Sequence, residues 1–385
     1  MDVPAEAPAP EADRQPGAPH PRETTTLFGQ DAAERAFLEA FNAGRLHHAW
    51  LLSGPEGIGK ATLAWRIARF LLTRPLQSSN AGGGLFGEDL APAPPRTLDT
   101  DPDHPAVRRA AALSEPRLFL LRRPWDAEKG RFKQDIPVDE VRRLKSFFNF
   151  SAVDGGRRVV IVDAADDLNT AAANALLKVL EEPPRDTVLL LVSHAPSRLL
   201  PTIRSRCRSL PLRQLADQDL SEALRAAFQD DAPDLPALIA LADGSAGRAL
   251  QLHEAGGPEA YAALIALLSD LPRLDRPAMV KLADSAAARG AEDRFDLLLT
   301  LTEFFLHRLA RTGAMGAAPS EAVQGEGALL ARLCPTPAHA RIWAQTGAEI
   351  VPRARAGRAV NLDASALLID MFLGLQSTAA GPAAA

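Results

Sequence analysis

The sequence predicts an α/β domain built on a five-stranded parallel sheet, followed by two helical domains. Short apolar runs rich in Val, Ile and Leu alternate with amphipathic segments from about residue 24 to residue 212, and no strand pattern follows. Continuous apolar runs are typical of strands buried on both faces, and their alternation with helices is typical of parallel sheets. The length of 385 residues also exceeds one ordinary core and predicts two or three domains.

The first part of the chain contains a tail, a helix and the first strand. Residues 1–23 are mainly Ala, Pro, Glu and Asp, with few large apolar side chains, so we expect a disordered tail. Residues 28–44 predict a helix with one apolar face, and Ala49–Ser53 predicts a strand. Residues 74–116 are rich in Gly, Pro, Asp and Ala and predict an irregular insertion, with one short helix near residues 105–113.

The other strands of the predicted sheet follow this insertion and are separated by helices. Residues 138–148 are amphipathic, and a second helix begins after Asn169, whose side chain is a good N-cap, and stops at Pro183. The predicted strands are residues 117–121, 158–162 and 187–192 and a short strand from residue 208.

Three domains are expected after the tail. The α/β domain is placed at residues 24–212, where the strand patterns lie. A small helical domain is placed at residues 213–256 and a larger, all-helical domain at residues 257–385, because the apolar residues there recur with helical spacing.

Composition excludes several classes of protein. Hydrophobic residues make up 46% of the chain and charged residues 24%, with a formal net charge of −5, which excludes overall disorder and a polyanion-coating protein. The only two cysteines, Cys207 and Cys334, exclude a disulfide framework and a cysteine-based zinc site. No apolar run approaches ~20 residues, and Asp2, Glu6 and Glu11 occupy the place of a signal peptide's basic residues. We therefore expect a soluble, cytoplasmic protein with no membrane partner.

Residues 54–62, GPEGIGKAT, form the strongest local motif, because they follow a strand and open a helix. A glycine-rich loop in this position can turn its backbone N–H groups toward phosphates, which favours Gly54, Gly57 and Gly59 as the cradle. Lys60 would then reach the outer phosphates. The alternative is a glycine-rich strand-to-helix turn that binds no nucleotide.

The residue after Lys60 departs from the phosphate-loop pattern. The pattern G-x-x-x-x-G-K-[ST] requires a hydroxyl that completes Mg²⁺ coordination, and this chain has Ala61 there. Thr62, one residue later, lies roughly 100° further round the helix and is a poor substitute. We therefore expect that any ATP bound by this chain is not hydrolysed by it.

Asp163 ends an apolar strand, at the edge where open α/β sheets bind ligands. It could hold Mg²⁺, or it could be a structural strand-end acid. An ATPase of this kind usually has a glutamate next to this aspartate to activate water, and this chain has Ala164. Asp166 and Asp167 are expected to cap the next helix or to face solvent. The losses at Ala61 and Ala164 argue together against intrinsic hydrolysis.

Two further residues are candidates for nucleotide contacts, each with a simpler alternative. Ser193 follows the strand at residues 187–192 and could touch a γ-phosphate, or it could make ordinary loop hydrogen bonds. Arg248, in the small helical domain, could close onto a nucleotide, or it could be a solvated helix arginine.

Arg206 lies in a basic tip, IRSRC, just before the last predicted strand. An arginine there either stays at its own surface or extends across an interface to ATP held by a neighbouring subunit, as an arginine finger. Cys207 is expected to be a packing residue rather than a reactive thiol. No metal-ligating cluster is predicted.

These motifs, taken together, resemble the AAA+ clamp-loader subunits of bacterial DNA replication. Their order and spacing cover about residues 24–250, and LLKVLEEPP combined with SRC is highly specific, whereas the later helices match only in kind and length. The matching motifs are LFGQ near Phe28, RLHHAWLLSGPEGIGKATLAW at 45–65, IPVDEVR at 136–142, NALLKVLEEPP at 174–184, SRLLPTIRSRC at 197–207 and GSAGRAL at 244–250.

The resemblance implies a fold, an assembly and partners. It implies an AAA+ P-loop NTPase-type domain, a small helical lid and a C-terminal helical collar. The assembly would be a hetero-pentameric DNA polymerase III clamp loader with gamma/tau motor subunits and a delta subunit, which places a sliding clamp on primed DNA. Residues 74–116 contain no cysteine, so the four-cysteine zinc module that many relatives carry is not expected.

The resemblance also implies roles for individual residues. It implies a stator-type subunit with a vestigial nucleotide site, whose Arg206 serves the neighbouring motor subunit. Lys178 would face the DNA backbone, or it could be a solvated lysine. The rival reading is an ATP-hydrolysing AAA+ motor subunit or a related DNA-remodelling ATPase, which the intact Lys60 supports. A P-loop kinase is disfavoured because no acceptor pocket is indicated and the long helical region would have no role.

Overall fold

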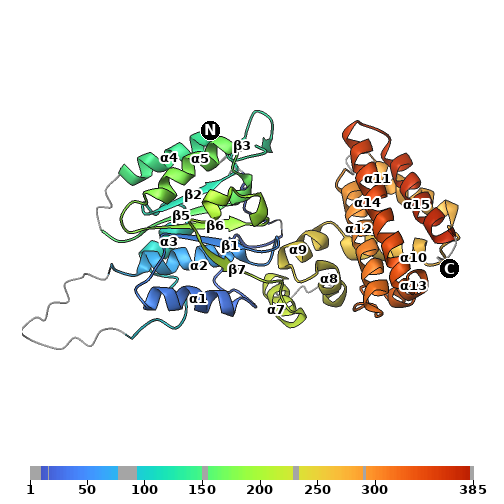
Figure 1. Ribbon diagram of the computed structural model, residues 1–385, viewed down its shortest axis with the longest axis horizontal. Helices are drawn as coiled ribbons and strands as arrows, with labels where there is room; N and C mark the ends of the chain where they lie inside the picture. Colours follow the sequence, from blue (N-terminus) through green and yellow to red (C-terminus); the bar gives the residue numbers. More distant parts are fainter. Residues whose placement is uncertain are drawn as a thin grey trace, which may run out of the picture. The chain divides into compact units, whose positions relative to one another are not determined.

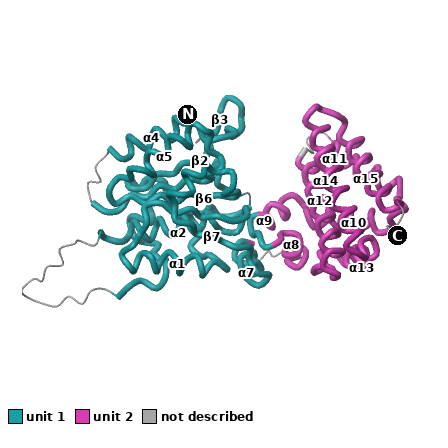
Figure 2. The backbone as a smooth tube through the Cα atoms, viewed as in Figure 1, with its two compact units in different colours: residues 1–227, 244–247 teal, residues 228–243, 248–385 magenta. Residues whose placement is uncertain are grey.

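The computed structural model describes residues 10–15, 17–76, 93–149, 155–228, 234–288 and 292–381. Its contacts group the chain into two compact units (Figure 2). The first comprises residues 1–227 with 244–247, and the second comprises residues 228–243 with 248–385. The contacts therefore divide the expected small helical domain between the two units, and the boundaries after residues 212 and 256 stay predictions.

The first unit is built on a five-stranded sheet in which every pair of neighbouring strands is parallel. The strand order is β2-β5-β6-β1-β7, so the first strand of the chain lies inside the sheet. This confirms the predicted parallel α/β fold. The strands are β1 (Ala49–Ser53), β2 (Leu118–Arg122), β5 (Arg158–Asp163), β6 (Thr187–Ser193) and β7 (Arg208–Pro211).

Helices cover both faces of this sheet (Figure 1). Alternate residues of each central strand enter different cores: Val159 and Ile161 pack with α1, α2 and α3, whereas Val160 and Val162 pack with α4 and α5. Burial on both faces explains why the strands are continuous apolar runs. The helices are α1 (Asp31–Asn42), α2 (Lys60–Thr73), α3 (Pro105–Ala111), α4 (Val138–Asn149), α5 (Thr170–Glu181) and α6 (Pro201–Arg204), with short 3₁₀ turns η1 (Ala165–Asp167) and η2 (Pro196–Arg198).

The predicted insertion contains the expected short helix, and an unexpected hairpin follows the insertion. The expected short helix is α3, which His104 caps by accepting a hydrogen bond from the backbone N–H of Ala106 at 3.1 Å. Residues 77–92 of the insertion lie outside the described residues. Beyond the insertion, β3 (Trp125–Asp126) and β4 (Arg131–Phe132) form a small antiparallel hairpin that the sequence pattern missed, because strands of two residues show no alternation.

Residues before Thr24 differ from the expected disordered tail. Residues 10–15 and 17–23 pack against the first unit, where the side chains of Asp13 and His20 are fully buried. Arg22 is mostly buried as well, and it pairs with Glu11. Glu11 and Asp13 of this segment also pair with Arg122 of the folded domain, which a composition argument does not detect. Residues 1–9 lie outside the described residues.

The second unit is helical, as predicted. Its long helix α12 packs chiefly on α14, and α15 packs on α11 and α14. Inside it, the buried carboxylate of Glu326 accepts hydrogen bonds from Arg308 Nε at 2.6 Å and from the Tyr261 hydroxyl at 2.6 Å. None of the described helices is long and apolar enough to cross a membrane. The helices that follow β7 are α7 (Asp217–Phe228), α8 (Leu235–Ala242), α9 (Ala246–Glu254), α10 (Gly257–Leu268), α11 (Arg276–Ala287), α12 (Glu292–Met315), α13 (Glu326–Leu333), α14 (Pro337–Ala359) and α15 (Ala364–Ala380).

Candidate nucleotide site and arginine tip

The loop between β1 and α2 has a backbone that only glycine tolerates. Gly54, Gly57 and Gly59 have φ angles of +147°, +74° and +97°, a region that residues with a Cβ rarely adopt. A Cβ on Gly57 would also lie 2.3 Å from Ser245 Oγ, and one on Gly54 would lie 2.6 Å from the Leu212 carbonyl oxygen. The predicted glycine turn is therefore present, and its shape fits a phosphate cradle at the start of α2.

The side chain of Lys60 is hydrogen-bonded to the loop that precedes it. Its side chain is 3% exposed, and Nζ donates hydrogen bonds to the carbonyl oxygens of Gly54, at 2.7 Å, and of Pro55. Burial lowers the pKa of Lys60 to about 8, although the carboxylates of Asp163 and Glu56 oppose that shift. The ammonium group that would meet the outer phosphates of a nucleotide is thus engaged by the loop's own carbonyls.

Asp163 ends β5 beside this loop, as predicted. Burial raises the pKa of Asp163 to about 7, the nearby charge of Asp13 raises it further, and the charge of Lys60 acts in the opposite direction. At neutral pH a substantial fraction of this carboxyl is therefore protonated. A protonated carboxyl is a poor ligand for Mg²⁺, which prefers charged oxygen donors.

Asp166 organises the end of β6 instead of facing solvent or capping α5, which corrects the expectation for that residue. Its carboxylate accepts hydrogen bonds from Ser193 Oγ at 2.8 Å and from the backbone N–H of His194. Asn169 caps α5 instead, accepting from the backbone N–H of Ala172 at 2.9 Å, as predicted. The Ser193 hydroxyl therefore makes a loop hydrogen bond, and a contact between Ser193 and a nucleotide stays a prediction.

The other candidate residues are Ala61 and Thr62, which lie in α2, and Arg248, which belongs to the second unit. Ala61 and Thr62 are half-buried in the first turn of α2. The phosphate cradle therefore fits a nucleotide, whereas the hydroxyl position that completes Mg²⁺ coordination is filled by an alanine. Arg248 lies in the second unit, where its guanidinium stacks over the ring of Phe304 at 5.2 Å and burial lowers its pKa. Its role toward a nucleotide stays a prediction.

Arg206 lies in the tight turn between α6 and β7. Its side chain is 36% exposed, its Nη2 lies 2.9 Å from Glu181 Oε1, and its Nη1 donates to the carbonyl of Thr202 at 3.1 Å. Glu181 is the last residue of α5 and is 50% exposed. The arginine is therefore held at its own surface by one solvent-exposed ion pair and one hydrogen bond to a backbone carbonyl.

Cys207, next to Arg206, packs against the α4–α5 side of the core. Burial raises the pKa of its thiol to about 12, so the reactive thiolate is scarce at neutral pH. This agrees with the expected packing role.

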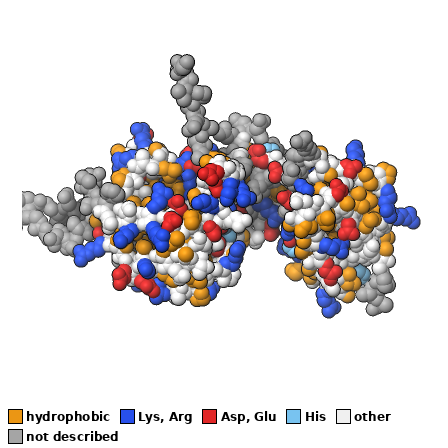
Figure 3. Space-filling view, turned by 90° about the horizontal axis from the view of Figure 1, so that it is seen from above, with side chains coloured by type: hydrophobic (Ala, Val, Ile, Leu, Met, Phe, Trp, Pro, Cys, Tyr) orange, Lys and Arg blue, Asp and Glu red, His pale blue; other side chains and the backbone are white. Residues whose placement is uncertain are grey.

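Lys178 is exposed on α5, and a contact with DNA stays a prediction. Figure 3 shows Lys and Arg side chains interspersed with Asp and Glu on the face of the molecule that it draws.

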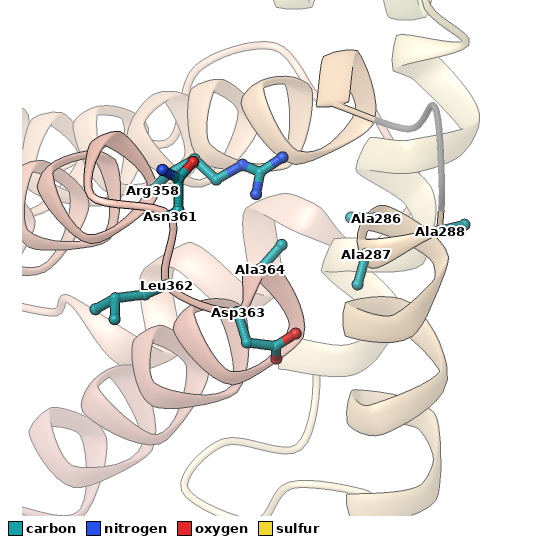
Figure 4. A pocket seen from close by; sticks show the side chains of 8 residues that line it. All are labelled: Ala286, Ala287, Ala288, Arg358, Asn361, Leu362, Asp363 and Ala364. Carbon is teal, nitrogen blue, oxygen red and sulfur yellow. The ribbon is translucent and has the colours of Figure 1, made fainter.

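A pocket lies in the second unit, where the end of α11 meets the turn from α14 to α15 (Figure 4). Its ionisable lining groups are Arg358 and Asp363, and the other lining residues are small, apolar or neutral. Within the described residues, no group of three or more His, Cys, Asp and Glu side chains could hold a metal ion. The residues that line the pocket are Ala286, Ala287, Ala288, Arg358, Asn361, Leu362, Asp363 and Ala364.

Sequence reasoning missed three residues that shape the two sites. Asp13 lies in the expected disordered tail, Arg122 ends a strand without belonging to any motif, and Glu181 was read only as part of LLKVLEEPP. Their partners are distant in sequence, so no local spacing could have shown the pairs. The one signal in the sequence was a charged residue at the end of a strand, because open α/β sheets bind ligands at the carboxyl ends of their strands.

The parallel sheet, the glycine loop between β1 and α2 and the acid at the end of β5 have the arrangement of a phosphate-loop nucleotide-binding domain. A family model described as "DNA polymerase III, delta subunit" matches residues 99–216. The delta' subunit of DNA polymerase III from Pseudomonas aeruginosa is 43% identical over 222 residues, covering 57% of this chain and 59% of that protein. The Escherichia coli delta' subunit is 36% identical over 219 residues, covering 56% and 57%.

Other similar proteins are named as gamma/tau or gamma-related chains of DNA polymerase III. The gamma/tau subunit of Mycobacterium tuberculosis DNA polymerase III is 32% identical over 205 residues, covering 53% of this chain and 31% of that protein. A gamma-subunit-related structure from Thermotoga maritima aligns with 17% identity and a TM-score of 0.39, covering 89% of this chain and 99% of that chain. Over about half of its length this chain is therefore similar to proteins named as delta' and gamma/tau subunits of bacterial DNA polymerase III. It spans less than two thirds of the length of the two delta' relatives.

Proposed function

We propose that this chain is a delta-prime-like, non-hydrolysing subunit of a clamp loader and that Arg206 acts on ATP held by a neighbouring subunit. Its partners would be gamma/tau motor subunits and a delta subunit. Through that assembly it would help to place a sliding clamp on primed DNA. The names of the relatives support the assembly, and the chain's own residues support the division of labour described next.

The surroundings of Arg206 carry this proposal. The guanidinium is tied to Glu181 by a single exposed ion pair at 2.9 Å. Exposed ion pairs contribute only ~0–1 kcal/mol, so releasing the arginine toward a neighbour costs little. A freed guanidinium has the planar donor geometry and the permanent charge that stabilise a transferring phosphoryl group.

The phosphate loop supports a site without hydrolysis. Gly57, Gly59 and Lys60 would hold the phosphates, and a bound Mg²⁺ would neutralise their charge. Ala61 supplies no hydroxyl for that ion, and Ala164 supplies no carboxylate to activate water. The raised pKa of Asp163, about 7, weakens the remaining metal ligand further.

Reconstitution of the complex tests the role of Arg206. Arg206→Ala should slow DNA-stimulated hydrolysis at the adjacent motor subunit by ~10³-fold, since arginine fingers supply ~10³ to 10⁵ in rate. Arg206→Lys should restore only part of the loss, because an ammonium cannot make the bidentate contact. Arg204→Ala, an exposed arginine two residues away, is the matched control and should change little.

Assembly must be measured alongside activity. The Arg206→Ala subunit should enter the complex with wild-type stoichiometry in size-exclusion chromatography. If the assembled Arg206→Ala complex turns over ATP at the wild-type rate, Arg206 is not the finger and the proposal fails.

The rival function is an ATP-hydrolysing motor subunit, and the intact Lys60 beside a glycine cradle favours it. The isolated chain then would hydrolyse ATP in a Mg²⁺-dependent manner. Our proposal expects no turnover above that of a Lys60→Ala control. Turnover that Lys60→Ala abolishes would favour the rival.

A further inference from the structure

A segment near the start of the chain is bound to α2, the helix that opens at the phosphate loop. We call residues 10–15 and 17–24 the strap. Arg69 of α2, itself 3% exposed, donates from both terminal nitrogens to two strap carbonyls at 2.6 Å each. His20 is fully buried, and its ring meets the edge of Trp65 of α2 with 6.2 Å between ring centroids. The strap is therefore a packed element of the first unit.

Charged side chains of the strap contact the end of the sheet beside Asp163. Arg122 is the last residue of β2, and it pairs in register with Asp163 of β5. Its guanidinium donates to the fully buried carboxylate of Asp13 and to Glu11 Oε1 at 3.1 Å. His20 Nε2 lies 3.2 Å from the same Asp13 oxygen. Two carboxylates of the strap thus pair with Arg122, the residue that lies in register with Asp163.

This arrangement changes the electrostatics of the phosphate-loop site. The fully buried carboxylate of Asp13 is held against Arg122, the residue that pairs in register with Asp163. Arg122, which offers positive charge at this edge, is thus paired with Asp13 and with Glu11. Added negative charge and lost positive charge both disfavour a ligand that carries several phosphates.

We propose that the strap is an autoinhibitory element, whose Asp13 and Glu11 dock on Arg122 and oppose the binding of a Mg²⁺–nucleoside triphosphate at the loop of residues 54–62. Nucleotide binding and docking of the strap are then linked, so each lowers the equilibrium constant of the other by the same factor. A bound triphosphate therefore releases the strap. This inference rests on the loop's capacity for nucleotide, and it is independent of Arg206.

Hydrogen exchange on the wild-type chain tests the link without any substitution. The backbone N–H groups of Glu23 and Thr24 donate to the His20 carbonyl at 2.8 and 3.1 Å, so they report on docking. Saturating Mg²⁺–ATP should speed their exchange by about fivefold or more, the lower end of ordinary coupling between sites. Unchanged exchange in the presence of bound Mg²⁺–ATP would overturn the inference.

Calorimetric titration with Mg²⁺–ATP gives the reciprocal test. The double variant Glu11→Gln with Asp13→Asn should bind Mg²⁺–ATP about fivefold or more tightly than the wild type, and its strap should exchange faster without ligand. Glu23→Gln is the matched control. Glu23 is also a strap acid, but it is 45% exposed and its contacts with Arg14 and Arg22 are at 3.7 Å. Its affinity should equal that of the wild type.

Two results of the titration would also overturn the inference. One is equal affinity of the wild type and the double variant although the strap of the variant is released. The other is the absence of Mg²⁺–ATP binding in both proteins. Either result leaves the action of Arg206 on a neighbour's ATP untouched, because these measurements use the isolated chain with Arg206 intact.

Discussion

Asp163 and Arg206 lie in one continuous stretch of the chain, but their surroundings are opposite. Asp163 ends a strand of the core, with Lys60, Asp13 and Arg122 around it, and its pKa is raised to about 7. Arg206 lies in an exposed turn and has one exposed carboxylate as its charged partner. The first site is closed and partly neutralised, whereas the second carries a permanent charge that a small cost in free energy can release.

The difference separates two functions that one nucleotide site normally combines. A hydrolysing subunit needs a charged metal ligand, a hydroxyl and a water-activating acid at its own loop. In this chain Ala61 and Ala164 remove two of these, while Arg206, which we propose serves another site, is intact. The comparison predicts that substitutions at the two sites have different effects on the complex.

The largest expected effect separates Lys60 from Arg206 in a reconstituted complex. Lys60→Ala should leave the DNA-stimulated ATPase nearly unchanged, because the loop that contains Lys60 is proposed not to hydrolyse ATP. Arg206→Ala should slow hydrolysis at the adjacent motor subunit by ~10³-fold. Steady-state phosphate release measures both. A loss of turnover in Lys60→Ala that equals the loss in Arg206→Ala would remove the distinction between the two sites.

Stability should distinguish the core of this stretch from its tip. Leu176 of α5 is fully buried between helix and sheet, so Leu176→Ala should lower the free energy of unfolding by ~2–5 kcal/mol. Arg206→Ala loses one exposed ion pair and should cost only ~0–1 kcal/mol. Urea unfolding followed by circular dichroism measures both. A large loss in Arg206→Ala would show that the tip is structural.

A further effect is a pH dependence that belongs to Asp163. The folded chain holds a proton on Asp163 up to about pH 7, whereas an unfolded aspartate releases it near pH 3.8. The folded state therefore binds more protons between these values, and the contribution of Asp163 to stability falls as the pH rises through that window. Asp163→Asn should flatten this part of the curve of unfolding free energy against pH. Arg206→Ala should keep the wild-type curve, and an unchanged curve in Asp163→Asn would contradict the raised pKa.

Much of the fold was predictable because its signals are local. Each central strand is a continuous apolar run, and Asn169 lies next to the helix that it caps, so short windows of sequence contain the information. The glycine turn was predictable for the same reason. The hairpin of β3 and β4 was not, since two-residue strands have no period.

The side-chain partners of both sites were beyond prediction from sequence. Arg206 and Glu181 come from different elements, and Asp13 meets Arg122 across more than a hundred residues, so only the folded chain brings them together. Asp166 was assigned to solvent or a helix cap because it precedes a helix. Its actual partner, Ser193, comes from the next strand of the sheet.

The most direct test of the account measures the chemical step on the neighbouring subunit. ATP bound to the motor subunits of the assembled complex should be followed through a single turnover, with wild-type chain and with Arg206→Ala. The account predicts that ATP affinity is nearly unchanged while the hydrolysis step slows by ~10³-fold, because a finger acts on the transition state. An unchanged hydrolysis step would contradict it.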